Sequence, residues 1–526
     1  MRPQPTRRTA LNSLAGLAGV AGAAGAVVTG FHPSARAWAT DRDSGGASHG
    51  GSPPWEAVPP LDGTLHTDDA ARAAAADDFG HIVHRTPAAV LRPGSVDDIV
   101  TMVRYCGRHR IPVAPRGQAH ATHGQAQTEA GLVIKTSPLA DIGPVRHGSA
   151  GHGSAGHGTV TVGAGAKWSD VTKATLASGL TPPVFTDYLE LSVGGTLSVG
   201  GLGGQTHQHG AQTDTVTELQ VVTGAGELVR CSPTRHRDLF DAVRAGLGQC
   251  AIIVSATLRL VRAPRTVRHY LLPYTDLGTF LADQRLLVEQ RRFSYVEGQI
   301  AADDTGAYRT YLLEAVAYGP PAGPEPDDEL LLHGLRFDPA GKETEDLDYY
   351  SFLDRLGPVF TEQKESGLWD YAHPWLNLLL PGDATESLAG DILRDLTPDD
   401  VGPGGVVLLY PLQRKRLHTE LLRMPPHDPT PYLLAVLRAC PPDDHATVRR
   451  LLAANRTAYE AVRDHCGKRY PVGSIPTHPH DWPTHFGPTW PAFRAAKHRY
   501  DPHGVLTPGQ RIFSDAGRRH RPDQST

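Results

Sequence analysis

A glycine-containing decapeptide, Arg116–Gln125 (Arg-Gly-Gln-Ala-His-Ala-Thr-His-Gly-Gln), most constrains the fold of this chain. It comes just after an apolar stretch at 111–114, which we predict to be a strand. A glycine turn after a strand lets backbone N–H groups converge on an anion such as a pyrophosphate. Glycine permits the positive φ angles and the close backbone approach that such a turn requires. We therefore expect a nucleotide-binding loop here, with the imidazole of His120 within reach of the bound group.

Strands and helices alternate with glycine turns through the first half of the chain. The expected elements are a helix after the capping-box pair Ser95 and Asp98, strands at 131–135 and 159–162, a helix at 167–178 closed by Gly179, a hairpin at 219–222 and 227–230, a helix at 238–245 and a strand at 252–261. This order indicates an α+β nucleotide-binding lobe. The segment Gly-Ala-Gly-Ala-Lys-Trp at 163–168 lacks the third glycine of a Rossmann fingerprint, so that fold is not expected.

A second lobe is expected after Ala263, where the glycine density falls and longer amphipathic segments begin. A strand pair is predicted at 293–300 and 308–318. We therefore divide the chain into a first lobe at 61–262, a second domain at 263–486 and a turn-rich return to the first lobe at 487–526. At 526 residues the chain is long enough for two or more such units.

The N-terminal 39 residues have the composition of an export signal. Arg7 and Arg8 precede a mild apolar run at 14–28, and small residues suitable for cleavage occur at 35–39. Paired arginines in this position are typical of twin-arginine export, which moves folded proteins to the periplasm or the outside of the cell. A disordered basic N-terminus is the alternative. The run is too short for a permanent transmembrane helix, and residues 40–60 are expected to be a flexible linker.

Charge, cysteine content and a histidine repeat bear on three possible features of the chain: nucleic-acid binding, disulfide bonds and a metal site. With 51 basic and 56 acidic residues and no basic stripe, a nucleic-acid partner is not expected. Five scattered cysteines, an odd number, indicate buried thiols with at most one or two incidental bridges. Histidines recur every five residues at 147, 152 and 157 within a glycine-rich stretch. Such a stretch between strands is more typical of a surface loop than of a metal site, so no metal is predicted.

Several motifs along the chain together resemble one enzyme family. They are Arg116–Gln125, Phe-Thr-Asp-Tyr-Leu at 185–189, Ser-Val-Gly-Gly-Thr-Leu-Ser at 192–198, Gly-Leu-Gly-Gln at 246–249, Tyr-Val-Glu-Gly at 295–298, His-Pro-Trp-Leu-Asn at 373–377 and Thr-Pro-Gly-Gln at 507–510. In this order they resemble cytokinin dehydrogenases, within the vanillyl-alcohol-oxidase type of flavoproteins, from about residue 61 to 513. The resemblance implies FAD between two lobes. The first lobe and the C-terminal return would form the FAD-binding domain, and the second domain would place a sheet over the flavin and bind the cytokinin.

The resemblance also implies how the flavin is held. His120 matches a histidine that is joined covalently to the flavin, while His123 is the competing candidate. Gln118, Ala119 and Ala121 depart from the usual Gly-His-Ser around it: Ala119 restricts the turn and Ala121 removes a hydroxyl. Pro476 stands where a flavin-contacting tyrosine is usual, and no cysteine near Asp187 offers a second covalent link. The matching flavin-contact positions are Gly117, Gln118, Ala119, His120, Ala121, Gln125, Asp187, Ser192, Ser198, Leu202, Ile253, Thr507 and Gln510.

For the chemistry, the resemblance implies oxidative removal of the N6 side chain of adenine-type cytokinins, giving adenine and an aldehyde. A carboxylate beside the amine would accept its proton while a hydride passes to the flavin, and burial favours such basicity. Asp187 matches this base, although Thr-Asp also commonly caps a turn. Glu297 would bind the adenine ring. In a strand it shares a face with Phe293, Tyr295 and Gln299, and an edge glutamate in water is the alternative.

Trp375 and Asn377 match residues that line the substrate cavity, although ordinary core packing is the alternative. Reduced flavin would pass its electrons to a quinone or to O₂. Two other functions stay open on sequence alone: a flavin oxidase of another small alcohol, sugar, phenol or amine on the same scaffold, and a non-catalytic flavin-binding protein.

Overall fold

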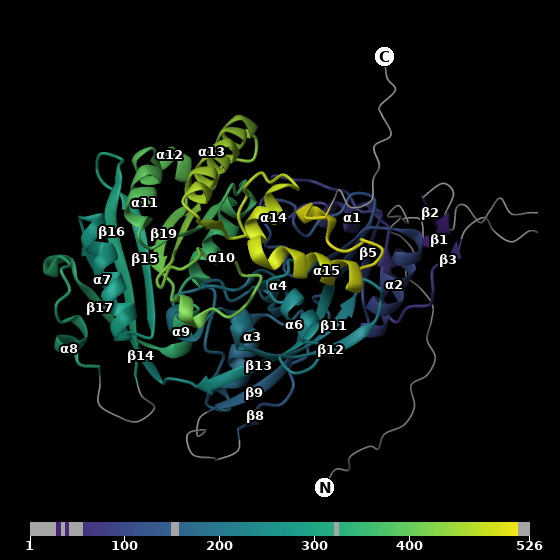
Figure 1. The fold of residues 1–526 in the computed structure, drawn as a ribbon, viewed down its shortest axis with the longest axis horizontal. Coiled ribbons are helices and arrows are strands. Elements are labelled where there is room, and N and C mark those ends of the chain that lie inside the picture. The colour runs from purple at the N-terminus through teal and green to yellow at the C-terminus, as the bar shows by residue number, and fades with distance from the viewer. Residues whose placement is uncertain (1–27, 33–36, 41–55, 149–156, 320–325, 514–526) are drawn as a thin grey trace, which may run out of the picture.

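The computed structural model describes residues 28–32, 37–40, 56–148, 157–319 and 326–513. The described chain mixes helices and sheets in an α+β fold with two lobes (Figure 1). One lobe carries a four-stranded and a six-stranded sheet, and the other is built on an eight-stranded antiparallel sheet.

The first lobe is formed by the two smaller sheets and the helices beside them. Its four-stranded sheet has the order β4 (Thr64–His66), β5 (Ala89–Arg92), β7 (Leu132–Lys135) and β6 (Val113–Arg116). Its six-stranded sheet has the order β12 (Leu228–Cys231), β11 (Val216–Thr223), β13 (Ala251–Arg262), β9 (His157–Gly163) and β8 (Arg146–His147), with β10 (Leu180–Thr181) paired to β13. The helices are α1 (Asp69–Ala75), α2 (Val96–His109), α3 (Trp168–Leu176), α4 (Val193–Val199), α5 (Thr206–His209), η2 (Gln212–Thr215) and α6 (Arg237–Val243).

The start of α2 illustrates how local sequence fixes this lobe. The Ser95 side chain accepts a hydrogen bond from the backbone N–H of Asp98, as a helix N-cap does. The Asp98 carboxylate completes no reciprocal box. It accepts instead from the N–H groups of Asp62, Gly63 and Gly94, each at 2.8 Å. Asp98 therefore ties the chain entering β4 to the helix that follows β5.

The eight-stranded sheet forms the second lobe. Its order is β17 (Glu343–Asp348), β14 (Thr266–Tyr274), β16 (Tyr308–Tyr318), β15 (Tyr295–Ala302), β19 (Val406–Pro411), β20 (Tyr432–Leu437), β18 (Leu376–Leu380) and β21 (Lys468–Arg469). Its main covering helices are α7 (Leu277–Gln290), α11 (Thr385–Arg394) and α13 (His445–Asp464) (Figure 1). Shorter helices connect the strands: α8 (Asp328–Leu332), η3 (Pro339–Gly341), α9 (Tyr349–Leu353), α10 (Gly357–Glu365), η4 (Leu368–Asp370), α12 (Pro398–Val401) and η5 (Arg414–Arg416).

The two faces of strand β15 have different surroundings. Val296 and Ile300 join the apolar core under α7, and Gly298 packs directly against the Phe280 side chain of that helix. Side chains two residues apart in a strand point to the same face, so Glu297 and Gln299 point the other way, into a cavity. The prediction that Phe293 shares their face is wrong. Phe293 precedes the strand and packs against Tyr270 in the other core, because the strand alternation begins only at Tyr295.

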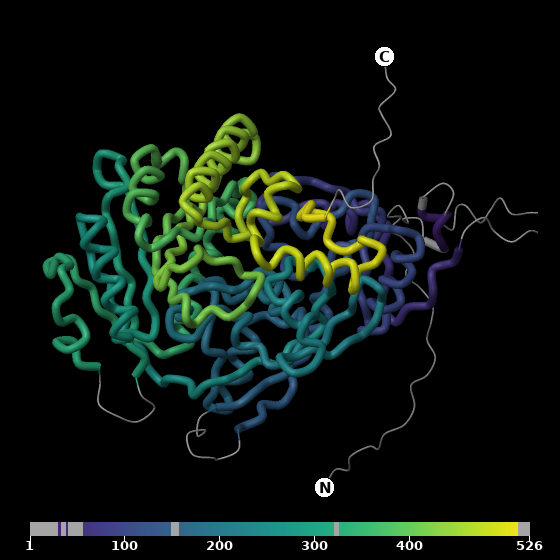
Figure 2. Tube along the Cα trace, viewed as in Figure 1, coloured from purple at the N-terminus to yellow at the C-terminus, as the bar shows by residue number. Residues whose placement is uncertain are grey.

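The C-terminal segment returns to the first lobe. It forms α14 (Asp481–Phe486), η6 (Gly487–Thr489), α15 (Trp490–Tyr500) and η7 (Pro508–Gln510). Helix α15 packs against α6, and Leu506 pairs in parallel with Val113 of β6. In Figure 2 this yellow segment accordingly runs beside chain from the N-terminal third. The return brings Thr507 and Gln510 to the loop that follows β6.

Two short strands lie within the segment expected to be an export signal. Strands β1 (Val28–His32) and β2 (Ala37–Thr40) form a small sheet with β3 (Glu56–Ala57). Phe31 is buried there, with its ring 5.1 Å from that of His109 on α2. The paired arginines lie outside the described residues. No helix among the described residues is both long and apolar enough to span a membrane.

The burial of the cysteines agrees with the prediction from sequence at four of five positions, and the histidine repeat is described only in part. No cysteine forms a disulfide, and Cys106, Cys231, Cys250 and Cys440 are buried, as predicted. Cys466 is exposed, because it lies in the turn after α13. The middle of the histidine repeat, 149–156, lies outside the described residues. Within the described ranges, no group of three or more His, Cys, Asp or Glu residues is arranged to hold a metal ion.

Candidate active site

A cavity of about 500 Å³ lies between the first lobe and the eight-stranded sheet. That volume is in the range typical of small-molecule and cofactor sites. All the site residues predicted from sequence line this one cavity, although they come from segments spread over nearly 400 residues of chain. They are Gly117, Gln118, Ala119, His120, Ala121, Gln125, Asp187, Ser192, Ser198, Leu202, Ile253, Glu297, Trp375, Asn377, Thr507 and Gln510.

The loop after β6 forms one wall of the cavity. Gly117 lies so close to α4 that a Cβ atom there would be 2.0 Å from the Ser192 hydroxyl, so no side chain fits. Ala119 has a φ of 62°, a left-handed conformation that glycine adopts more easily. The loop keeps this shape because the N–H groups of Phe79 and Gly80 bond to the carbonyls of Ala119 and Ala121. Ala119 therefore carries some backbone strain but does not prevent the turn.

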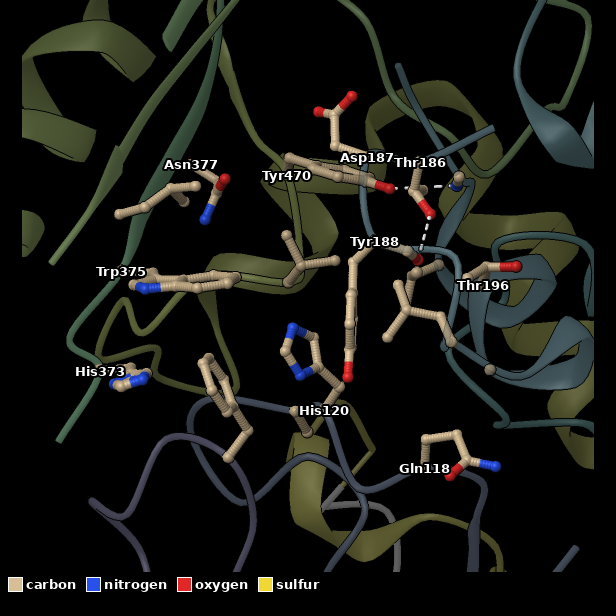
Figure 3. A pocket seen from close by; sticks show the side chains of 18 of the residues that line it. Gln118, His120, Thr186, Asp187, Tyr188, Thr196, His373, Trp375, Asn377 and Tyr470 are labelled. Atoms are coloured by element: carbon tan, nitrogen blue, oxygen red, sulfur yellow. Dashed lines mark hydrogen bonds between the residues drawn. The ribbon is translucent and has the colours of Figure 1, made fainter. Parts of the chain in front are cut away.

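His120 lies in an aromatic environment at this wall. Its ring stacks on Phe79 with centroids 4.1 Å apart, and the rings of Tyr188 and Trp375 lie 5.2 and 5.7 Å away. Figure 3 shows the imidazole between Trp375 and Tyr188. Burial, with a smaller contribution from the nearby Lys364 cation, lowers the pKa of His120 to about 3. The imidazole is therefore neutral at neutral pH, with a free lone pair on one nitrogen.

His123, the competing candidate, does not line the cavity. Its backbone N–H donates to Gln125 Oε1 at 2.7 Å, and burial lowers the pKa of its imidazole to about 4. The position of the two histidines thus favours His120 as the residue that faces a bound flavin.

Three carboxylates and one arginine meet at the opposite end of the cavity. Asp187 lies in the loop before α4 and is half-buried. Its Oδ1 accepts a hydrogen bond from the Tyr295 hydroxyl at 3.0 Å and from Arg355 Nη2 at 3.2 Å. Glu297 on β15 and Glu314 on β16 face each other across the strand pair. Figure 3 shows Asp187 at the far end of the cavity from His120.

The two glutamates of this cluster differ in charge. Glu297 is only 2% exposed, and burial together with the charges of Asp187 and Glu314 raises its pKa well above the usual range. Burial also acts on Glu314, but the Arg355 guanidinium at 2.9 Å outweighs it and lowers the pKa of Glu314 to about 2. Glu297 is therefore the one of the two that holds a proton more strongly, and in its protonated form it can donate a hydrogen bond, while Glu314 is a carboxylate at neutral pH.

Four buried polar atoms in the cavity wall have no hydrogen-bond partner among the described residues. They are Oε1 of Glu297, Nδ2 of Asn377, Nδ1 of His373 and Nε of Arg438. Buried polar groups are normally paired, and each exception needs a reason. A ligand with donors and acceptors on one flat edge would pair the first two. Together with the aromatic wall and the tightly approached loop at Gly117, these atoms fit a cavity that holds a flavin and a second flat molecule.

Sequence reasoning missed several residues of this site. Tyr470 lines the cavity, and its hydroxyl accepts a hydrogen bond from the Gly201 N–H at 3.1 Å, whereas Pro476 does not line it. The wall therefore keeps a tyrosine, contrary to what Pro476 suggested. Arg355 was also missed, since nothing in the connection between α9 and α10 marks it. Glu314 offered a signal, because it is a lone charge in the apolar run Leu312–Ala317.

Comparison with known proteins agrees with this geometry. Residues 310–513 match the family model described as "Cytokinin dehydrogenase 1, FAD and cytokinin binding", and residues 87–232 match an FAD binding domain. Cytokinin dehydrogenase 6 of Oryza sativa subsp. japonica is 36% identical over 86% of this chain and 91% of its own length. Cytokinin dehydrogenase 1 of Arabidopsis thaliana is 34% identical over 86% and 83%. An uncharacterized oxidoreductase, ORF5 in the fasciation locus of Rhodococcoides fascians, is 41% identical over 86% of this chain and its own whole length.

Proposed function

Since this chain belongs to the cytokinin dehydrogenase family of FAD-dependent oxidoreductases, we propose that it cleaves the N6 side chain of isopentenyladenine-type cytokinins. Loss of the hydride and the amine proton converts the C–N bond to an imine, and hydrolysis of this imine by water gives adenine and an aldehyde. A buried Glu297 with an unpaired oxygen, in the same cavity as Asp187, is the observation that carries this proposal.

The flavin is held by the loop at 117–121 and by the residues of α4, β13 and η7 that line the cavity. Bound there, FAD would supply the acceptor for the hydride that leaves the carbon next to the amine nitrogen. We propose that His120 is joined covalently to it. The neutral imidazole, kept so by burial against Phe79, supports this role because only an unprotonated nitrogen has a lone pair to form the bond.

Asp187 accepts the proton of the substrate amine. The Tyr295 hydroxyl and the Arg355 guanidinium both bond to Oδ1, which leaves Oδ2 without a partner among the described side chains and available to the amine. Glu297, in its protonated form, offers the adenine edge one donor and one acceptor, and Asn377 offers a further donor. Trp375 supplies a flat apolar surface against which a purine can stack.

The product assay tests this function. The purified holoenzyme is incubated with N6-isopentenyladenine and a soluble quinone, and adenine is measured by chromatography. We expect adenine in amounts that match the quinone reduced, and no turnover of a small alcohol or a sugar offered in its place. Quinone reduction by an alcohol or sugar, with no adenine from the cytokinin, would favour another flavin oxidase on the same scaffold.

We also propose that the protein is exported by the twin-arginine route. The pair Arg7 and Arg8 ahead of a mild apolar run supports this. Replacing both arginines by lysine in the full chain should keep the protein inside the cell, as measured by fractionation. An unchanged distribution between cell and medium would contradict export by this route.

A further inference from the structure

Arg355 occupies a central place in the carboxylate cluster. It lies between α9 and α10, and its side chain is 16% exposed. The guanidinium carbon is 4.7 Å from the centre of the Phe352 ring and 5.1 Å from that of Tyr295. Packed against two aromatic rings, the guanidinium has little freedom to move, and its donors point in fixed directions.

The donors of Arg355 connect two carboxylates that come from different lobes. Nε donates to Glu314 Oε1 at 2.9 Å, and Nη2 donates to Asp187 Oδ1 at 3.2 Å and to the Tyr295 hydroxyl at 2.5 Å. The same oxygen, Glu314 Oε1, lies 3.0 Å from His269 Nε2. Asp187 belongs to the first lobe, whereas Glu314, Tyr295 and His269 belong to the eight-stranded sheet. Arg355 thus bridges the lobes at the site.

The charges of the cluster determine where a single proton resides. If Asp187, Glu297 and Glu314 were all ionised, one guanidinium would face three negative charges in a mostly buried place. Glu314 bonds directly to Arg355 and is the carboxylate best paired with it. Glu297 has no contact with the guanidinium that would pair it, and one of its oxygens has no partner. The proton therefore belongs on Glu297, while Asp187 keeps its hydrogen bond to Arg355.

We propose that Arg355, anchored by Glu314 and His269, is a positioning residue that holds Asp187 in the orientation of the proton acceptor and leaves the shared proton on Glu297. This inference rests on the proposed function and assigns separate roles within it to Arg355, Asp187 and Glu297. The ionisable groups that face the cluster are Tyr295 and Glu297 on β15, Glu314 and Tyr318 on β16, His269 on β14, Tyr410 on β19 and Asp187 in the loop before α4.

The pH profile of cytokinin oxidation tests the proposal. We expect Arg355→Gln to lower kcat by about 100-fold, the order of loss that misplacement of a reacting group causes. The acidic limb of the profile should move to higher pH, because a carboxylate without its neighbouring cation takes up a proton more readily. Arg355→Lys keeps the positive charge but loses the several fixed N–H donors of the guanidinium. The acidic limb of its pH profile should therefore stay near that of the unaltered enzyme, while its kcat falls.

A double variant separates positioning from simple charge neutralisation. If Arg355 served only to neutralise Glu314, Arg355→Gln combined with Glu314→Gln would restore the rate and the profile. We expect no restoration, because Asp187 has still lost its donor. Adenine binding to each holoenzyme by calorimetry, across the same pH range, gives a readout independent of turnover, and circular dichroism and flavin content confirm folding.

Two results would overturn the proposal. One is recovery of kcat in the double variant. The other is a pH profile of correctly folded Arg355→Gln that keeps the shape of the unaltered enzyme's profile. If the unaltered enzyme itself yields no adenine from N6-isopentenyladenine, the proposed function fails, and that outcome is distinct from either result on Arg355.

Discussion

The two ends of the cavity use burial in different ways. At the His120 end, aromatic rings surround the imidazole and burial keeps it neutral, with a pKa of about 3. At the carboxylate end, the same physical effect raises the pKa of Glu297 well above its usual range. There, however, Arg355 holds Glu314 ionised in spite of burial. Burial therefore decides the state of the imidazole at one end, whereas at the other end burial and a cation act on neighbouring carboxyls in opposite directions.

This difference fits a division of tasks. A neutral imidazole in an apolar wall suits attachment of a cofactor, which happens once. Proton transfer in every turnover needs one particular group as the acceptor. A single cation beside three carboxyl groups determines which of them are ionised and which one holds a proton. Substitutions at each end should therefore differ in what they change.

The largest effect is expected at Asp187. Asp187→Asn removes the proposed proton acceptor but keeps the size of the side chain, so kcat for N6-isopentenyladenine should fall by about 10²- to 10⁴-fold, the usual contribution of a general base. The flavin spectrum should be unchanged. Glu190→Gln is a matched control, because Glu190 lies in the same loop, pairs with Lys167 and does not line the cavity. An Asp187→Asn enzyme with normal turnover would remove Asp187 from the mechanism.

The second effect concerns stability at acid pH. The pKa of Glu314 is lowered from 4.5 to about 2. Its stabilising contribution to the free energy of unfolding is therefore present above pH 4.5 and is lost as the pH falls toward 2. The amount is on the order of 3 kcal/mol of unfolding free energy. Glu314→Gln should remove this acid dependence, measured by urea unfolding between pH 3 and 7. Glu343→Gln, at an exposed position on the edge strand β17 of the same sheet, is the control and should leave it unchanged.

The contribution of Glu297 to stability should depend on pH in the opposite direction. Because its folded-state pKa is raised, its contribution is present below pH 4.5 and is lost as the pH rises toward that folded-state pKa. Glu297→Gln should therefore flatten the loss of stability on the alkaline side. It should also raise KM for the cytokinin about 10-fold, the cost of about one or two hydrogen bonds. A KM that stays unchanged, with a lower kcat, would move Glu297 from binding to proton transfer.

The smallest effect on rate is expected at His120. His120→Gln should abolish covalent attachment, so that acid precipitation releases all the flavin, while kcat falls by less than about tenfold because the carboxylate end is intact. His123→Gln is the matched control and should leave the flavin attached. Flavin that stays with the acid-denatured His120→Gln chain would contradict the assignment.

The sequence predicted the alternation of elements better than the contacts between them. The strands at β9, β11, β12 and β13 and the helix closed by Gly179 follow from periodicity and turn residues, and the structure confirms them. Gly179 has a φ of 69°, as a helix C-terminus of this type requires. Local pattern is enough for these elements because their hydrogen bonds are made with near neighbours in sequence.

Apart from the glycine-containing loop that carries His120, the site residues were predicted mainly through family resemblance. Spacing alone does not bring Asp187, Glu297 and Asn377 together, since three separate parts of the chain supply them. Arg355 was missed because its partners, Asp187 and Glu314, are far away in sequence and no local pattern marks the loop that carries it. Long-range pairing of charges is visible only once the lobes are placed against each other.

The most direct test of the central claim is an anaerobic reaction of the purified holoenzyme with N6-isopentenyladenine, followed by the visible absorbance of its flavin. We expect the flavin to bleach in the unaltered enzyme and in Glu190→Gln, but only very slowly in Asp187→Asn. Flavin that is present, is bleached by dithionite and does not respond to the cytokinin would contradict the claim that this cavity oxidises cytokinins.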